Sequence, residues 1–107
     1  MATSKEYLLY ILDQLSLIEG ITHRKMMGEY ILYHRGKIAA YLCDGCLLVK
    51  ILPSTQAFLP SARQKPPYDG AKNMLLVENV EDRAFLRDLF EAMYQELPEP
   101  SKKRKKT

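Results

Sequence analysis

The chain has 107 residues, of which 47% are hydrophobic and 27% charged, so disorder over its whole length is excluded and one small folded domain is indicated. The formal net charge is +3, but five of the 16 basic residues stand together near the C-terminus, at positions 102–106. Residues 1–100 hold 11 basic and 13 acidic side chains, a formal charge of −2, so nucleic-acid binding by a broadly basic body is excluded.

An amphipathic helix is predicted over residues 4–18. Thr3 and Glu6 have the spacing of a capping box, in which the two side chains satisfy free amides at the start of a helix. Gly20 then ends the segment. The apolar stripe that would face a core recurs at helical spacing and comprises Tyr7, Leu8, Ile11, Leu12 and Leu15.

The next part of the chain changes to the two-residue period of β-strands. The β-prone runs are 30–34, 37–42 and 46–51, separated by two dipeptides suited to tight hairpin turns, Arg35-Gly36 and Asp44-Gly45. These runs predict an antiparallel meander. A further strand over 21–27 leads into it, and Gly28 marks a bend or bulge.

The second half is predicted to contain two helices and one strand. A short helix is expected over 52–59, an irregular loop over 60–73, and an inner or edge strand over 74–78. We expect Asn79 to be the N-cap of the last helix, with Glu81 and Asp82 in its first turn. The apolar stripe of that helix comprises Leu86, Leu89, Phe90, Met93, Tyr94 and Leu97, and stops at Pro98.

The order of these elements predicts an α+β fold. It would have two layers, with an antiparallel sheet of about four to five strands and the N- and C-terminal helices packed on one face. We assign residues 1–98 to this domain and residues 99–107 to a disordered basic C-terminal tail, because consecutive like charges repel one another.

The N-terminal residues lack the basic region and apolar core of a secretory signal. No apolar run approaches the ~20 residues that a membrane-spanning helix needs. These two features predict a cytoplasmic protein without a membrane partner. Because cytoplasmic thiols stay reduced, no disulfide framework is expected.

Cys43 and Cys46 form a C-x-x-C motif, a pattern that binds zinc or exchanges disulfides in other proteins. A closed zinc site needs four ligands, and His23 and His34 are not spaced as a ligand pair. A C-x-x-C motif that exchanges disulfides should stand at the start of a helix, where the helix dipole lowers the thiol pKa. Here the motif lies on a predicted hairpin turn. We therefore predict two small apolar side chains that flank the turn, with no metal and no cofactor.

The sequence contains no catalytic motif that would identify an enzyme. There is no Gly-rich phosphate loop, no H-E-x-x-H and no nucleophile elbow, so no catalytic residue is assigned. Aromatic side chains stack on bases in some single-strand binders. Here Tyr7, Phe90 and Tyr94 fall on helix faces that the core needs, which favours packing between helices and sheet.

The basic tail supports two interpretations of equal weight. Its side chains are suited to contact phosphates, with weak, non-specific and strongly salt-dependent binding. A solvated terminus that keeps the domain soluble accounts for the same residues. The residues concerned are Lys102, Lys103, Arg104, Lys105 and Lys106.

Five segments in order carry a resemblance to a known family: residues 22–28, the hairpin 30–39, the run 47–50, Pro67-Tyr68 and Met74. Together they resemble the TfoX N-terminal domain family, which occurs at the start of the TfoX/Sxy regulators of genetic competence and as a stand-alone domain. The resemblance extends over residues 4–97. Many members have two successive glycines where this chain has Gly28-Glu29.

The resemblance implies the same α+β fold and an association with transcription and competence regulation. The leading hypothesis is a non-enzymatic regulatory or protein-interaction domain that contacts a protein partner or a second copy of itself. The contact would use a sheet edge or an unused helix face. The alternatives are an accessory nucleic-acid binder that uses the basic tail, and a small-ligand or metal-binding domain that uses Cys43 and Cys46.

Overall fold

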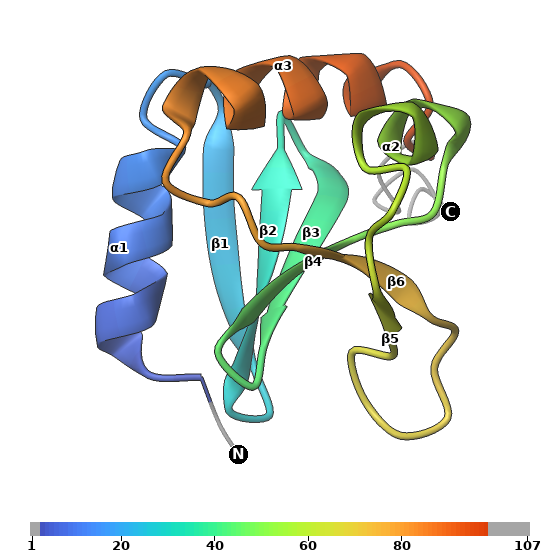
Figure 1. Cartoon of the computed structure of the whole chain (residues 1–107). Helices are drawn as coiled ribbons and strands as arrows, with labels where there is room; N and C mark the ends of the chain where they lie inside the picture. Colours follow the sequence, from blue (N-terminus) through green and yellow to red (C-terminus); the bar gives the residue numbers. More distant parts are fainter. Residues whose placement is uncertain (1–2, 99–107) are drawn as a thin grey trace, which may run out of the picture.

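A computed structural model describes residues 3–98 as three helices and six strands (Figure 1). The helices are α1 (Lys5–Gln14), α2 (Pro53–Phe58) and α3 (Arg83–Tyr94). The strands are β1 (Ile21–Met26), β2 (Glu29–His34), β3 (Lys37–Cys43), β4 (Cys46–Val49), β5 (Gln64–Lys65) and β6 (Met74–Val77). The predicted tail, residues 99–107, lies outside the described residues.

The six strands form one sheet in the order β1-β2-β3-β4-β6-β5, and every neighbouring pair is antiparallel. The predicted α+β fold is therefore confirmed, with a strand count slightly above the expected four to five. The additional strand, β5, lies inside the stretch that was predicted to be a loop. It pairs with β6, so β6 is an inner strand.

Three tight turns connect the first four strands. In each turn both residues have positive φ: 52° and 84° at Met27-Gly28, 53° and 87° at Arg35-Gly36, and 55° and 70° at Asp44-Gly45. Paired positive φ angles characterise the type I′ turn, whose twist matches that of the flanking strands. The two predicted hairpins are confirmed, and the bend expected at Gly28 is a third turn of the same kind.

We expect Met27→Asn to raise the free energy of unfolding by about 1 kcal/mol, because asparagine tolerates positive φ better than methionine does. The Met27 side chain is 93% exposed, so its removal costs little packing. Urea denaturation of the two proteins measures the difference. Met27→Ala is the control, since alanine retains the backbone strain; an equal gain in Met27→Ala would contradict this explanation.

A single large core joins the helices to one face of the sheet. α1 and α3 both pack on this face, and α2 packs beside α3 (Figure 1). The buried helix residues include Leu8, Ile11 and Leu15 of the N-terminal segment and Leu86, Leu89, Phe90 and Met93 of α3. The opposite face of the sheet has a second, small apolar cluster around Cys43, Leu48 and Met74.

The predicted cap of the first helix is wrong. Ser4, not Thr3, is the N-cap, and its side-chain oxygen accepts a hydrogen bond from the Tyr7 amide at 3.1 Å. Thr3 is buried, and its hydroxyl donates to Oε1 of Glu29 at 2.6 Å. The Glu29 carboxylate, distant in sequence, therefore binds the hydroxyl that the local pattern assigned to the helix cap. The predicted end of the helix is also wrong, since the helix ends at Gln14 and not at residue 18.

The predicted start of the last helix is also wrong. Asp82 is the N-cap of α3, and its Oδ1 accepts a hydrogen bond from the Phe85 amide at 3.0 Å. Asn79 and Glu81 therefore precede the helix. Asparagine and aspartate cap helices about equally well, so local preference alone did not separate the two positions. The residues of the predicted stripe are buried, except that Tyr94 is half-buried, but the helix ends at Tyr94 and Leu97 lies beyond it.

Candidate functional site

The two cysteines flank the turn between β3 and β4, in the predicted place. Cys43 and Cys46 are directly opposite each other in the strand register, and both are free thiols. Burial, with a further contribution from the Glu29 carboxylate, raises the pKa of Cys43 to about 11. Cys43 is therefore a protonated thiol at neutral pH, which is a poor nucleophile and a poor metal ligand.

The side chain of Lys65 links this turn to β5. Its Nζ lies 3.2 Å from Oδ2 of Asp44 and 3.8 Å from Sγ of Cys46. Within residues 3–98, no three His, Cys, Asp or Glu side chains are arranged so that they could hold a metal ion. That the cysteine pair binds no metal stays a prediction, and the binding of a metal or a small ligand stays its alternative.

The structure separates the two histidines. His23 is exposed on β1, whereas His34 is fully buried at the end of β2. The His34 ring contacts the Tyr94 ring edge-on, with 4.9 Å between centroids. Neither ring nitrogen makes a well-formed hydrogen bond with the described residues. Because His34 and Cys43 lie at opposite ends of the β2–β3 hairpin, they do not form a catalytic pair.

Basic side chains from the β2–β3 turn surround Tyr94 at the end of α3. Nζ of Lys37 donates to the Tyr94 carbonyl at 3.1 Å and lies 4.2 Å from the centre of its ring. The guanidinium of Arg35 lies 5.3 Å from the same ring. Cations at a helix C-terminus satisfy free carbonyls and the helix dipole. Arg35 and Lys37 therefore hold the C-terminal end of α3 against the sheet. This role was not evident from the sequence, because these residues and Tyr94 lie far apart along the chain.

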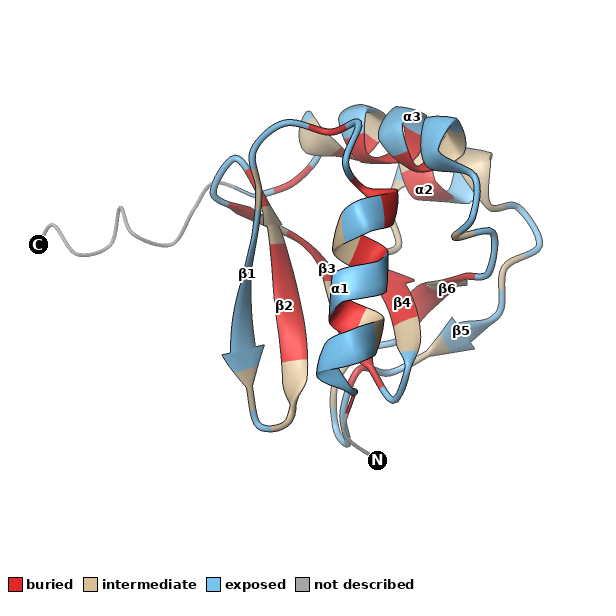
Figure 2. Ribbon diagram, turned by 90° about the vertical axis from the view of Figure 1, so that its left-hand side faces the viewer, coloured by how far each residue is buried: buried red, intermediate tan, exposed pale blue. Residues whose placement is uncertain are grey.

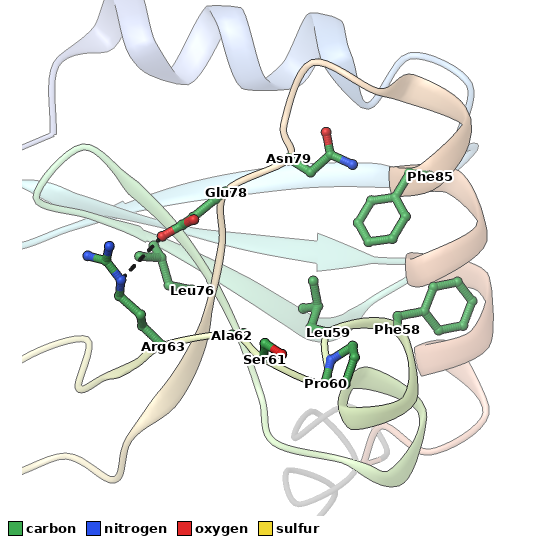
Figure 3. Close-up of a pocket in the computed structure, with 10 residues that line it drawn as sticks. All are labelled: Phe58, Leu59, Pro60, Ser61, Ala62, Arg63, Leu76, Glu78, Asn79 and Phe85. Carbon is green, nitrogen blue, oxygen red and sulfur yellow. Dashed lines mark ion pairs between the residues drawn. The ribbon is translucent and has the colours of Figure 1, made fainter.

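An apolar pocket of about 360 Å³ lies between the residues that follow α2 and the start of α3 (Figure 3). Phe58 and Phe85 face each other on one side, with ring centroids 6.0 Å apart. On the other side Arg63 pairs with Glu78, with 3.6 Å between Nε and Oε2. Because the two charges are paired with each other, this pocket offers an incoming molecule apolar surface and the neutral polar side chains of Ser61 and Asn79, but no unpaired charge.

The outer edge of β1 is one of the two open edges of the sheet. β1 is the first strand of the sheet, and residues 22–25 are exposed along it (Figure 2). Met26 and Glu29 flank a two-residue turn, and they form the first hydrogen-bonded pair of the two strands. Hydrogen-bonded and non-hydrogen-bonded pairs alternate along an antiparallel ladder. The amides and carbonyls of His23 and Lys25 therefore point away from β2. In the described part of the chain, no other backbone group bonds to this edge.

This open edge is also basic on both faces of the sheet. Arg24 is paired with Ile31 and Lys25 with Tyr30, so their side chains lie on opposite faces. Neither forms an ion pair with a described residue. The adjacent basic residues Arg24 and Lys25 are visible in the sequence. Their position at the edge of the sheet depends on the order of the strands, which the sequence did not establish.

These features define a small α+β domain. Its helices cover one face of an antiparallel sheet, and the outer edge of its first strand is unpaired among the described residues. The chain belongs to the TfoX N-terminal domain family, because the family's sequence profile matches residues 13–99. A similar protein is the "Uncharacterized 12.7 kDa protein in trpE 5'region" of Spirochaeta aurantia, 31% identical over 100% of this chain and 94% of the relative. No solved structure matches the chain.

Within residues 3–98, no helix is both long enough and apolar enough to cross a membrane. The family assignment confirms the resemblance seen in the sequence.

Proposed function

We propose that this domain is a non-enzymatic regulatory module that binds another protein by pairing an extended, acidic segment with β1. The observation that carries the proposal is the open outer edge of β1. Its outward-facing amides and carbonyls are suited to accept a further strand, the mode of binding called β-augmentation. Backbone hydrogen bonds would supply affinity, and side chains beside the added strand would supply specificity.

Charge supports an acidic partner in preference to a second copy of this chain. Two β1 strands pairing edge to edge would bring two copies of Arg24 and Lys25 together, and like charges on adjacent strands destabilise a sheet. Glutamate or aspartate side chains on the added strand would instead meet a cation on either face. Electrostatic attraction of this kind also speeds the encounter of the two molecules.

Arg24→Glu/Lys25→Glu tests the proposal with a glutamate-rich peptide of about eight residues, slightly longer than a typical strand. We expect the charge reversal to weaken binding by about tenfold, because it replaces two surface attractions by two repulsions. Fluorescence anisotropy of a labelled peptide measures affinity, and amide chemical shifts identify the strand that is contacted. Higher salt should weaken binding to the unchanged protein.

Arg63→Glu/Arg87→Glu is the matched control, since it makes the same change of net charge at two exposed arginines away from β1. We expect this control to bind the peptide as the unchanged protein does. His23→Pro tests the hydrogen bonding itself, because it removes an outward amide while the bonds to β2 remain. Equal loss in the control, shifts away from β1, or preference for an oligonucleotide would contradict the proposal.

A further inference from the structure

A second pocket lies on the sheet face that the helices leave uncovered, and we call it the loop pocket. It has a volume of about 600 Å³, within the usual range for small-molecule sites. One wall comes from the sheet and the segment after β4, and the other from the loop between β5 and β6. The residues that matter below are Tyr41, Lys50, Pro67, Tyr68, Lys72 and Met74.

The walls of the loop pocket are mainly apolar and aromatic. Met74 and Pro67 are buried, and Tyr41 is half-buried. Tyr68 stands on the loop with 56% of its surface exposed. Burial raises the pKa of Tyr41, and the nearby Tyr68 adds to this rise, as expected for two phenols that face one space. The pocket therefore offers two aromatic side chains to a flat or apolar body.

Two lysines supply the charge of the loop pocket. Lys50 is half-buried, and burial lowers its pKa. Neither Lys50 nor Lys72 forms a salt bridge or a side-chain hydrogen bond with a described residue. The described residues that line the pocket include no Asp or Glu. A half-buried ammonium group without a counter-ion is costly, and an anion in the pocket would offset that cost.

Two further pockets lined by described residues lack this combination. In the pocket between α2 and α3, Arg63 is already paired with Glu78. The other also contacts Tyr68 and lies beside Cys43, and among the described residues its charged lining residues are the acidic Glu29 and Asp69. Of these three pockets, the loop pocket alone joins aromatic walls to unpaired positive charge.

We infer that the loop pocket binds a small organic anion with an aromatic or apolar body. The anionic group would lie between Lys50 and Lys72, and the body would lie against Tyr41 and Tyr68. This site is separate from the outer edge of β1, so the inference does not depend on the proposed protein partner.

The test compares two fluorescent probes that share an aromatic body. The probe 8-anilino-1-naphthalenesulfonate carries a sulfonate, and N-phenyl-1-naphthylamine is its neutral counterpart. We expect the folded protein to bind the sulfonate with one site per chain and about tenfold more tightly than the neutral probe, which lacks the charge-assisted contact. Equal affinity for the two probes, or no saturable binding of the sulfonate, would overturn the inference.

Variants identify the site. Lys50→Met should weaken sulfonate binding about tenfold and leave the neutral probe unchanged, whereas Lys50→Arg should retain the preference for the anion. Tyr68→Ala should weaken both probes, since it removes part of the wall. Lys65→Met is the control, because Lys65 lies on β5 outside this pocket. The inference fails if Lys50→Met binds the sulfonate normally, or if Lys65→Met loses as much affinity.

Discussion

Phe90→Ala is expected to lower the free energy of unfolding by about 3–5 kcal/mol. Phe90 lies in the middle of α3, is 0% exposed, and is among the largest fully buried side chains of the described residues. It belongs to the core that joins α3 to the sheet, so its removal leaves a cavity that the packed neighbours cannot fill. Domains of this size have about 5–15 kcal/mol of total stability, so the variant should lose much of it.

Phe85→Ala is the matched control, because Phe85 lies on the same helix but is only partly buried. We expect a loss of about 1–2 kcal/mol for this variant, in proportion to the smaller apolar area that it uncovers. Urea denaturation followed by circular dichroism measures both losses. If both variants lost the same stability, the assignment of Phe90 to the centre of the core would be wrong.

The hairpins could be predicted because their signals are local. At Arg35-Gly36 and Asp44-Gly45, a glycine that accepts positive φ stands between two β-prone runs, and a two-residue link leaves little choice of turn. Met27-Gly28 carries the same signal, but methionine is a poor residue for the first turn position. The sequence therefore indicates a bend or bulge at Gly28 less specifically than it indicates the other two turns.

The cap of the first helix could not be predicted because the partner of Thr3 is distant in sequence. Thr3 has the right spacing for a capping box with Glu6, yet its hydroxyl bonds to Glu29 on β2. The amide of Asp44 also donates to Glu29 Oε1, at 3.1 Å. One carboxylate thus fastens the N-terminal segment to the β3–β4 turn. Such a network is formed by the tertiary fold, and local propensity contains no record of it.

The candidate binding surfaces could be predicted only in part. The basic residues Arg24 and Lys25 are evident in the sequence, but whether β1 is an edge strand depends on which strands pair. The insertion of β6 between β4 and β5 likewise brings the loop before β6 over the uncovered face of the sheet and creates the loop pocket. Lys50 carried no sequence signal, because only this topology makes it a half-buried cation.

The charges on β1 serve a second purpose under the proposed function. An unpaired edge strand is a site for uncontrolled pairing between molecules, and proteins commonly place lysine there to prevent it. Arg24 and Lys25 would oppose pairing of β1 with another copy of itself while they attract an acidic strand. Neutralising both residues should therefore reduce the preference for an acidic strand over a second copy of β1, as well as the affinity for the acidic strand.

Acidification should destabilise the domain through His34. The desolvation of its buried ring lowers the pKa of His34, and the positive charges of Arg35 and Lys37 act in the same direction. The Glu91 carboxylate, 3.8 Å from Nε2, and the Phe90 backbone oppose this effect but do not outweigh it. Below about pH 6.5, the usual pKa of histidine, the unfolded chain therefore binds a proton that the folded protein does not.

This difference in proton binding sets the sign and the size of the effect. The contribution of His34 to stability is fully present above about pH 6.5 and is lost as the pH falls, by at most about 1.4 kcal/mol per pH unit. His34→Phe should remove this dependence between about pH 7 and 5.5, since a phenyl ring packs against Tyr94 without an ionisable group. His23→Gln, which removes the exposed histidine, should retain it. Urea denaturation at each pH measures the slope, and an unchanged slope in His34→Phe would show that another group takes up the proton.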